Sequence, residues 1–246
     1  MNILVCISKA PDTTSKITFK DGNTSFNEDG VQFIVNPYDE WYALVRALEL
    51  KEAQGGKVTI ISVGGADYEP IMRKALAIGA DEAVRVDIQP TDAYQVAAEI
   101  AAFASGKGFE LILTGKETID YNGSQVGGML AALLDIPYVS NATKIDVNGS
   151  DATIERDKQA GTEVLGASLP IVVSAAKGMA EQRIPNMRGI MAARSKPLQV
   201  VAATAAQSLT QIVGYELPAE KGSVKLINPE DVKELVNLLH NEAKVI

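Results

Sequence analysis

The chain has 246 residues, of which 46% are apolar and 22% charged, with 23 Lys and Arg residues against 31 Asp and Glu. This length is sufficient for one large domain or two small ones with a buried core, and the apolar fraction excludes a disordered chain. The net charge of -8 argues against nucleic-acid binding, which needs a basic surface to displace counterions.

The scarcity of Cys and His argues against two common chemistries. Cys6 and His240 are the only soft metal ligands, too few for a zinc site, and a catalytic triad would depend on His240 in a charged tail. We therefore predict no metal site and no catalytic centre. A lone Cys fits a reducing, cytoplasmic location, and the absence of both a signal peptide and a long apolar run predicts no membrane insertion.

Short apolar runs alternate with helical patterns along the chain. Residues 3–7, 58–63 and 111–114 are apolar runs closed by Gly or Pro, as is typical of buried strands in a parallel sheet. Residues 39–54, 69–78 and 93–105 carry apolar residues at helical spacing. This order predicts right-handed crossovers and a doubly wound, mostly parallel α/β sheet.

Other segments interrupt or follow this alternation. Residues 17–35 and 143–174 alternate around turn sequences, which predicts hairpins. Residues 177–197 are basic and expected to be irregular, and residues 200–217 form an arm low in charge. A strong N-cap at residues 228–231 predicts a terminal amphipathic helix. We expect an α/β domain over residues 1–200 and an arm with a helix over residues 201–246.

The polar, glycine-containing loop of residues 115–128 is the most informative segment. Ligands of open parallel sheets bind outside the carboxyl ends of the strands, and free N–H groups at a helix start favour phosphate. Ser124 can cap the helix or donate to a phosphate, and Gly123, Gly127 and Gly128 allow close approach. A flexible loop with an ordinary cap explains the same spacing, because no known phosphate-binding fingerprint is present.

Residues 36–39 form a second candidate site. Pro37 holds Asn36 extended, and Asp39 is placed to cap a helix that begins near Glu40. The structural cap is the favoured interpretation; the alternative has Asn36 and Asp39 bind an adenine edge or a ribose. Cys6, inside an apolar strand, is expected to be a packed thiol rather than a nucleophile.

The basic segment of residues 177–197 has two interpretations. It is either a solvated loop or an adaptable docking surface, because Met and Ile residues alternate with Arg along it. The residues alone leave both open.

Taken together, these residues resemble the beta subunits of the electron transfer flavoprotein (ETF) family over nearly the whole chain. The markers lie at residues 3–9, 36–39, 75–81, 119–127 and 154–157, the last leading to Leu169 and Pro170. Gln159 and Ala160 interrupt the family signature, and Tyr121 and Asn122 replace commoner acidic residues. The resemblance implies a Rossmann-like sheet of the type found in adenine nucleotide alpha hydrolases.

The resemblance also implies a function as an electron carrier rather than an enzyme. Such a chain pairs with an ETF alpha subunit that binds most of the redox FAD, while AMP has a structural role in the beta subunit. Electrons would pass from a flavin dehydrogenase, such as an acyl-CoA dehydrogenase of fatty acid oxidation, to a membrane ETF-quinone oxidoreductase. The C-terminal arm and helix would pack on the alpha subunit.

Two alternatives to this function are a bifurcating beta subunit with a second FAD and a stand-alone adenine-nucleotide-binding regulator. The loop at residues 120–125 reads Asp-Tyr-Asn-Gly-Ser-Gln. It resembles the AMP-binding pattern more than the Asp-Gly-Asp-Thr-Ala-Gln that is typical of bifurcating members.

The resemblance assigns residues to two sites. The implied nucleotide site contains Cys6, Asn36, Pro37, Tyr38, Asp39, Val63, Glu117, Thr118, Ile119, Asp120, Tyr121, Asn122, Gly123, Ser124, Gln125, Val126, Gly127 and Gly128. The implied partner-docking residues are Arg183, Ile184, Met187, Ile190 and Met191, with Met187 at the position of the apolar anchor.

Overall fold

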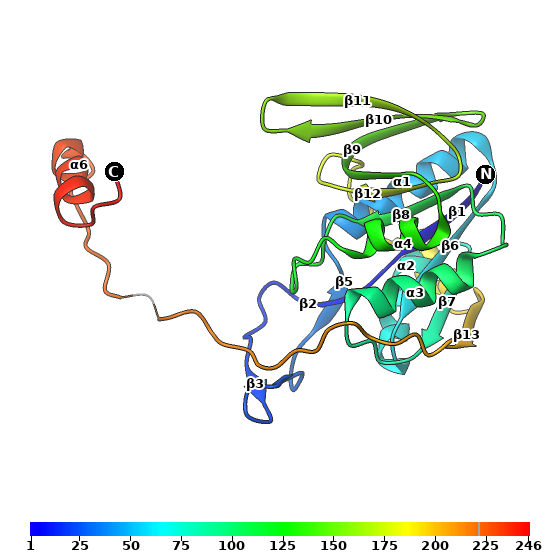
Figure 1. Cartoon of the computed structure of the whole chain (residues 1–246), viewed down its shortest axis with the longest axis horizontal. Coiled ribbons are helices and arrows are strands. Elements are labelled where there is room, and N and C mark those ends of the chain that lie inside the picture. Colours follow the sequence, from blue (N-terminus) through cyan, green and yellow to red (C-terminus); the bar gives the residue numbers. More distant parts are fainter. Residues whose placement is uncertain (221) are drawn as a thin grey trace.

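A nine-stranded sheet lies at the centre of the computed structural model, which describes residues 1–220 and 222–246 (Figure 1). The strand order is β11-β10-β9-β12-β8-β1-β6-β7-β13. The β11–β10 and β10–β9 pairs are antiparallel, and every later neighbouring pair in this order is parallel. The strands are β1 Asn2–Cys6, β6 Lys57–Val63, β7 Glu82–Asp87, β8 Leu111–Gly115, β9 Tyr138–Asn148, β10 Asp151–Lys158, β11 Gly161–Ser168, β12 Ile171–Ala175 and β13 Leu198–Ala202.

Helices cover both faces of this sheet. The helices are α1 Asp39–Gln54, α2 Glu69–Ile78, α3 Ala93–Ala104, α4 Val126–Leu134, α5 Met187–Ala193 and α6 Val232–Asn241, with a short 3-10 helix at Ala66–Tyr68. α1 and α2 pack on one face, α3 and α4 on the other, and α5 packs against α2. The predicted doubly wound fold is confirmed, and the predicted ranges of α1 and α2 agree with the structure.

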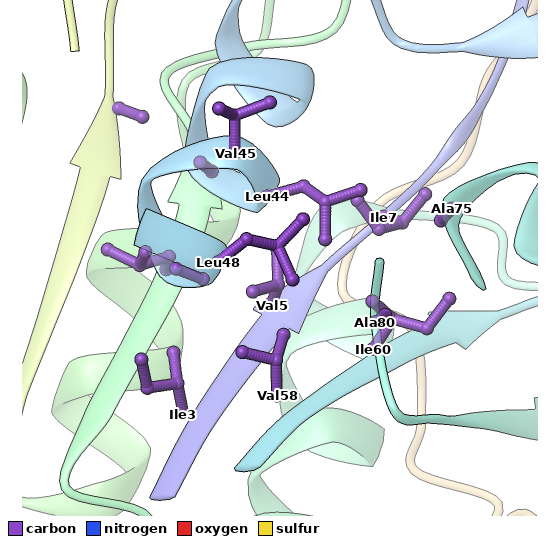
Figure 2. Close-up of a cluster of buried hydrophobic side chains, with 14 of the residues drawn as sticks. Ile3, Val5, Ile7, Leu44, Val45, Leu48, Val58, Ile60, Ala75 and Ala80 are labelled. Carbon is purple, nitrogen blue, oxygen red and sulfur yellow. The ribbon is translucent and has the colours of Figure 1, made fainter. Parts of the chain in front are cut away.

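The apolar core explains why these elements assemble. Leu44 and Leu48 of α1 point toward Val5 of β1 and Val58 of β6, as Figure 2 shows, and all four side chains are buried. Burying a side chain of this size stabilises the fold by about 1.5–3 kcal/mol. Alternate residues of the same strands face the second apolar layer under α3 and α4, so both faces of the parallel sheet are buried.

Four short strands follow β1 and precede α1. β2 Lys9–Pro11 pairs with β5 Phe33–Val35, and β3 Phe19–Lys20 pairs with β4 Ser25–Phe26. The second pair confirms a hairpin within residues 17–35. The β9–β10 hairpin likewise turns after Asn148, as its sequence predicts.

The structure corrects four local expectations. β7 was not predicted, because its alternating sequence includes Arg85, which is buried through bonds to Glu69, Asp87 and the Gly64 carbonyl. The segment predicted to be irregular contains α5, and the predicted arm begins with β13, which extends the sheet past residue 200. α4 begins at Val126, so the last three residues of the segment predicted to be a loop, 126–128, belong to this helix.

The arm that follows β13 lies along α3. Asp92 caps α3 with one carboxylate oxygen, and its other oxygen accepts bonds from the backbone N–H groups of Leu209 at 2.6 Å and Thr210 at 2.8 Å. The buried Glu99 accepts a bond from the Thr204 N–H at 2.7 Å. These contacts hold the first part of the arm, whereas α6 lies away from the body (Figure 1) and has no buried residue.

A buried carboxyl group joins α1 to the end of β1. The oxygens of Glu40 accept bonds from the Ser8 N–H and the Ser8 hydroxyl, both at 2.7 Å, and Glu40 is 6% exposed. Burial is the main cause that raises the pKa of Glu40 to about 8, and the Ser8 bonds oppose this shift. The folded protein therefore keeps a proton on Glu40 that the unfolded chain releases near pH 4.5.

This difference predicts a pH dependence of stability. Between the two pKa values the folded state binds more protons, so the Glu40 contribution is largest below about pH 4.5 and decreases as the pH rises to about 8. We expect Glu40→Gln to reduce the loss of Tm between about pH 5.5 and about pH 8.5 by roughly 3 °C or more in thermal unfolding. The exposed Glu181→Gln is the matched control; an identical pH profile for Glu40→Gln and wild type would contradict the assignment.

Candidate functional site

The candidate site lies at the carboxyl ends of β1, β6 and β8. The chain places β6 and β7 on one side of β1 and then β8 on the other, so the strand order reverses beside β1. Cys6, Val63 and Gly115 are the last residues of these three strands. A reversal of this kind is where open α/β sheets bind ligands.

The Asn36 side chain joins the two predicted parts of the site. Its amide donates to the Glu117 carbonyl at 2.8 Å and accepts a bond from the Ile119 N–H at 3.0 Å. Asn36 is completely buried. The side chain is therefore committed to holding the loop after β8, and Pro37 lies beside this junction.

The predicted cap by Asp39 is wrong. Tyr38 precedes the helix, and no side-chain bond caps α1. The Asp39 carboxylate instead accepts a bond from the Glu117 N–H at 3.3 Å, and burial raises its pKa. Tyr38 has φ 63°, a left-handed conformation that costs a residue with a bulky side chain about 1–3 kcal/mol, and the residue is 55% exposed. Both carboxyl groups of the first turn thus face the strand ends.

The loop of residues 116–125 is held by its own polar side chains. Lys116 pairs with Glu117 at 2.7 Å, and the Ser124 hydroxyl donates to Glu117 at 3.2 Å. The hydrogen bond and charge of Lys116 lower the pKa of Glu117. Ser124 therefore does not cap α4, which excludes one of its two predicted roles; Gln125 is the N-cap and makes no side-chain bond that caps the helix.

Free donors line the junction between this loop and α4. Among residues 1–220 and 222–246, no acceptor pairs with the backbone N–H groups of residues 123–128. Asn122 and Ser124 have positive φ angles of 49° and 52°, which turn the loop sharply ahead of the helix. Unpaired N–H groups and the positive end of a helix dipole together favour an anion.

The glycines of this junction have different roles. A Cβ on Gly127 would lie 2.9 Å from Thr114 Oγ1 and 3.0 Å from Tyr138, so Gly127 allows α4 to pack on the sheet rather than a ligand to approach. Gly123 faces open space, and Gly128 is in ordinary contact with Tyr138. The buried Thr114 hydroxyl has no partner among the described residues.

The remaining predicted residues differ in their exposure to solvent. Cys6 is buried, and burial, followed by the Glu40 charge, raises the pKa of its thiol, which fits a packed residue. Val63 is also buried, whereas Tyr121 is exposed at the tip of the loop. The structure brings together residues from all four predicted segments; the loop contributes Glu117, Thr118, Ile119, Asp120, Tyr121, Asn122, Gly123, Ser124, Gln125, Val126, Gly127 and Gly128.

The sequence alone did not identify two residues at this mouth. Ser8 binds Glu40, and Tyr215 of the arm places its hydroxyl 3.4 Å from the Tyr121 hydroxyl. The Tyr215 ring stacks on Phe19 with centroids 4.8 Å apart and planes 8° apart. No local pattern signals this long-range contact between the arm, the β3–β4 hairpin and the loop.

Of the predicted docking residues, Met187, Ile190 and Met191 lie on α5, and Arg183 and Ile184 lie just before it. Ile184, Met187 and Met191 are 81%, 73% and 68% exposed, and Ile190 is partly covered. Arg183 differs from them, because its guanidinium pairs with both carboxylate oxygens of Glu52. The structure therefore shows four exposed apolar side chains beside one neutralised cation.

The described ranges contain no group of three or more His, Cys, Asp or Glu residues placed to hold a metal ion. Among the helices of residues 1–220 and 222–246, none has the length and apolar character needed to cross a membrane.

Comparison with known proteins identifies the family. The electron transfer flavoprotein domain matches residues 23–206. The electron transfer flavoprotein subunit beta of Bacillus subtilis (strain 168) is 38% identical over 260 residues and is covered completely, as is this chain. The Syntrophomonas wolfei protein of that name is 34% identical over 100% of this chain and 98% of its own length, and the Homo sapiens protein is 32% identical over 94% and 95%. With its doubly wound sheet and strand-end loop, this chain belongs to the electron transfer flavoprotein family as a beta subunit.

Proposed function

We propose that this chain, a non-catalytic electron-carrier subunit, pairs with an ETF alpha subunit to carry electrons from flavin dehydrogenases to a membrane ETF-quinone oxidoreductase. Acyl-CoA dehydrogenases of fatty acid oxidation are the proposed donors, and the cytoplasm is the proposed location. The similarity over the full length of named beta subunits carries this proposal. The same similarity supports a carrier over a stand-alone regulator.

The nucleotide proposed for this subunit is AMP. The free N–H groups of residues 123–128 at the start of α4 fit a phosphate group. Asn36 and Asp39 hold the loop in the conformation that presents these donors. The Ser124 hydroxyl, now bonded to Glu117, is a further donor within the same loop. The sequence of residues 120–125 supports AMP over a second FAD.

The redox chemistry in this proposal comes from the FAD that the alpha subunit binds for the most part, which accepts and releases electrons when bound. The part of this chain is to hold its own nucleotide, to present a docking surface and to anchor the alpha subunit. The low pKa of Glu117 keeps its carboxylate charged and paired with Lys116, so this acid is neutralised beside the phosphate donors.

The arm and α6 are proposed to pack on the alpha subunit. α6 is amphipathic, and its apolar residues Val232, Leu235 and Val236 are 62%, 42% and 49% exposed. Leu209 and Val213 of the arm are 68% and 89% exposed. Exposed apolar surface of this extent is typical of an interface with a permanent partner.

A charge placed at Gly123 tests the phosphate site. A Cβ at this position meets nothing within 4 Å, so Gly123→Asp adds a negative charge beside the free donors without steric conflict. We expect the nucleotide content of the purified heterodimer to fall by about tenfold or more, because like charges at close range repel. Extraction followed by mass analysis measures the content and distinguishes AMP from FAD.

Two control variants separate charge from size and position. Gly123→Asn has nearly the same size without the charge, and Gly166→Asp places the charge on β11, where a Cβ also meets nothing within 4 Å. Both should keep the nucleotide. Full nucleotide content in Gly123→Asp, or two FAD molecules per heterodimer and no AMP, would contradict the proposal.

Truncation of Met187 tests the docking surface. Met187 is 73% exposed on α5, so Met187→Ala removes an apolar anchor without disturbing the core. We expect the KM for an acyl-CoA dehydrogenase to rise about fivefold or more, as for an interface hot spot, with FAD content unchanged. Leu133→Ala, at a 43% exposed position on α4, is the control. An unchanged KM in Met187→Ala would show that the partner docks elsewhere.

A further inference from the structure

The segment that carries the proposed docking residues is held rigidly at its start by α1. The Arg183 guanidinium donates to the two carboxylate oxygens of Glu52 at 2.6 and 3.1 Å. The Arg183 carbonyl accepts a bond from the Trp41 indole N–H at 3.2 Å. Both partners belong to α1, a helix whose inner side is fixed in the core.

The same segment is held by α2 further along. Gly189 approaches α2 so closely that a Cβ there would clash with the Ala77 carbonyl oxygen. Arg73 donates to the carbonyls of Ala193 and Lys196 at 2.8 and 2.7 Å. The Lys196 ammonium in turn donates to the Leu76 carbonyl at the end of α2 at 2.9 Å.

These contacts leave several apolar side chains of the segment exposed. Ile184 follows Arg183 directly and is 81% exposed, although apolar side chains gain nothing from water. Rigid presentation of such side chains reduces the entropy lost on binding a partner, which raises affinity without any new contact. The ion pair with Glu52 also neutralises the charge of Arg183, the residue next to Ile184.

From this arrangement we infer that Glu52, Arg183 and Trp41 form a clamp that positions the docking surface, and that Arg183 contributes to partner affinity through Glu52 rather than by contacting the partner. The inference rests on the proposed function for its partner. It assigns positioning roles to Glu52 and Trp41, which lie outside the segment, and changes the role expected for Arg183. Bidentate pairing and the hydrogen bond of Arg183 also lower the pKa of Glu52, so the pair stays ionised.

A charge exchange tests the clamp in the complete heterodimer. Glu52→Arg and Arg183→Glu each place like charges together, so each should raise the KM for an acyl-CoA dehydrogenase that reduces the wild-type protein, by about fivefold, with kcat unchanged. The double exchange restores an opposite-charge pair and should return the KM close to the wild-type value. Trp41→Phe, which keeps an aromatic ring but removes the N–H, should raise the KM to a smaller extent.

Hydrogen exchange supplies a second readout that needs no partner. Backbone amides of residues 184–191 should exchange faster in either single variant and return to the wild-type rate in the double exchange. Lys20→Glu, at an exposed position on β3, changes the net charge as Arg183→Glu does and should alter neither readout.

Three results would overturn the inference. A double exchange with a KM as high as that of Arg183→Glu would show that the partner reads the positive charge directly. Single variants with unchanged exchange rates would show that the pair does not order the segment. A KM that rises in Met187→Ala but in none of the clamp variants would reject the clamp while keeping the docking surface. If neither Met187→Ala nor any clamp variant changes the KM, the partner does not dock on this surface. The clamp then has no role in partner affinity.

Discussion

Two hydrogen bonds of the buried Asn36 amide, one donated and one accepted, determine the shape of the candidate site. They hold the loop after β8 against the segment before α1, at 2.8 Å to the Glu117 carbonyl and 3.0 Å from the Ile119 N–H. A buried amide needs partners for both its oxygen and its nitrogen, and this loop supplies both. Because Asn36 anchors the loop, it also fixes the position of the free N–H groups at the start of α4.

Much of the fold could be predicted from the sequence, because its strands are apolar runs and its helices have clear periodicity. The ranges of α1 and α2 follow directly from this pattern. β7 could not be found in this way, because Arg85 interrupts its apolar pattern and is buried only through partners distant in sequence. α5 is short, and its fit to α2 depends on the contact of Gly189 with a carbonyl group that no local pattern reveals.

The site was predicted less completely than the fold. Family resemblance indicated segments that the structure brings together, since residues 36–39 contact residues 117–128. The roles within these segments were less predictable: Asp39 and Ser124 satisfy Glu117 rather than helix ends, and Gly127 serves packing. An Asp or Ser side chain can bond to several different groups, and it bonds to the one that the tertiary structure places within reach. The local sequence does not show which group that is.

The chain crosses from one face of the sheet to the other at the edge strand β13. α5 lies on the α2 face before this strand, and the arm lies along α3 on the opposite face after it. If the proposed partners bind these two elements, a protein docked on α5 and an alpha subunit held by the arm lie on opposite faces of the nine-stranded sheet. In that arrangement, electron donors arrive and leave at one face without disturbing the subunit contact at the other.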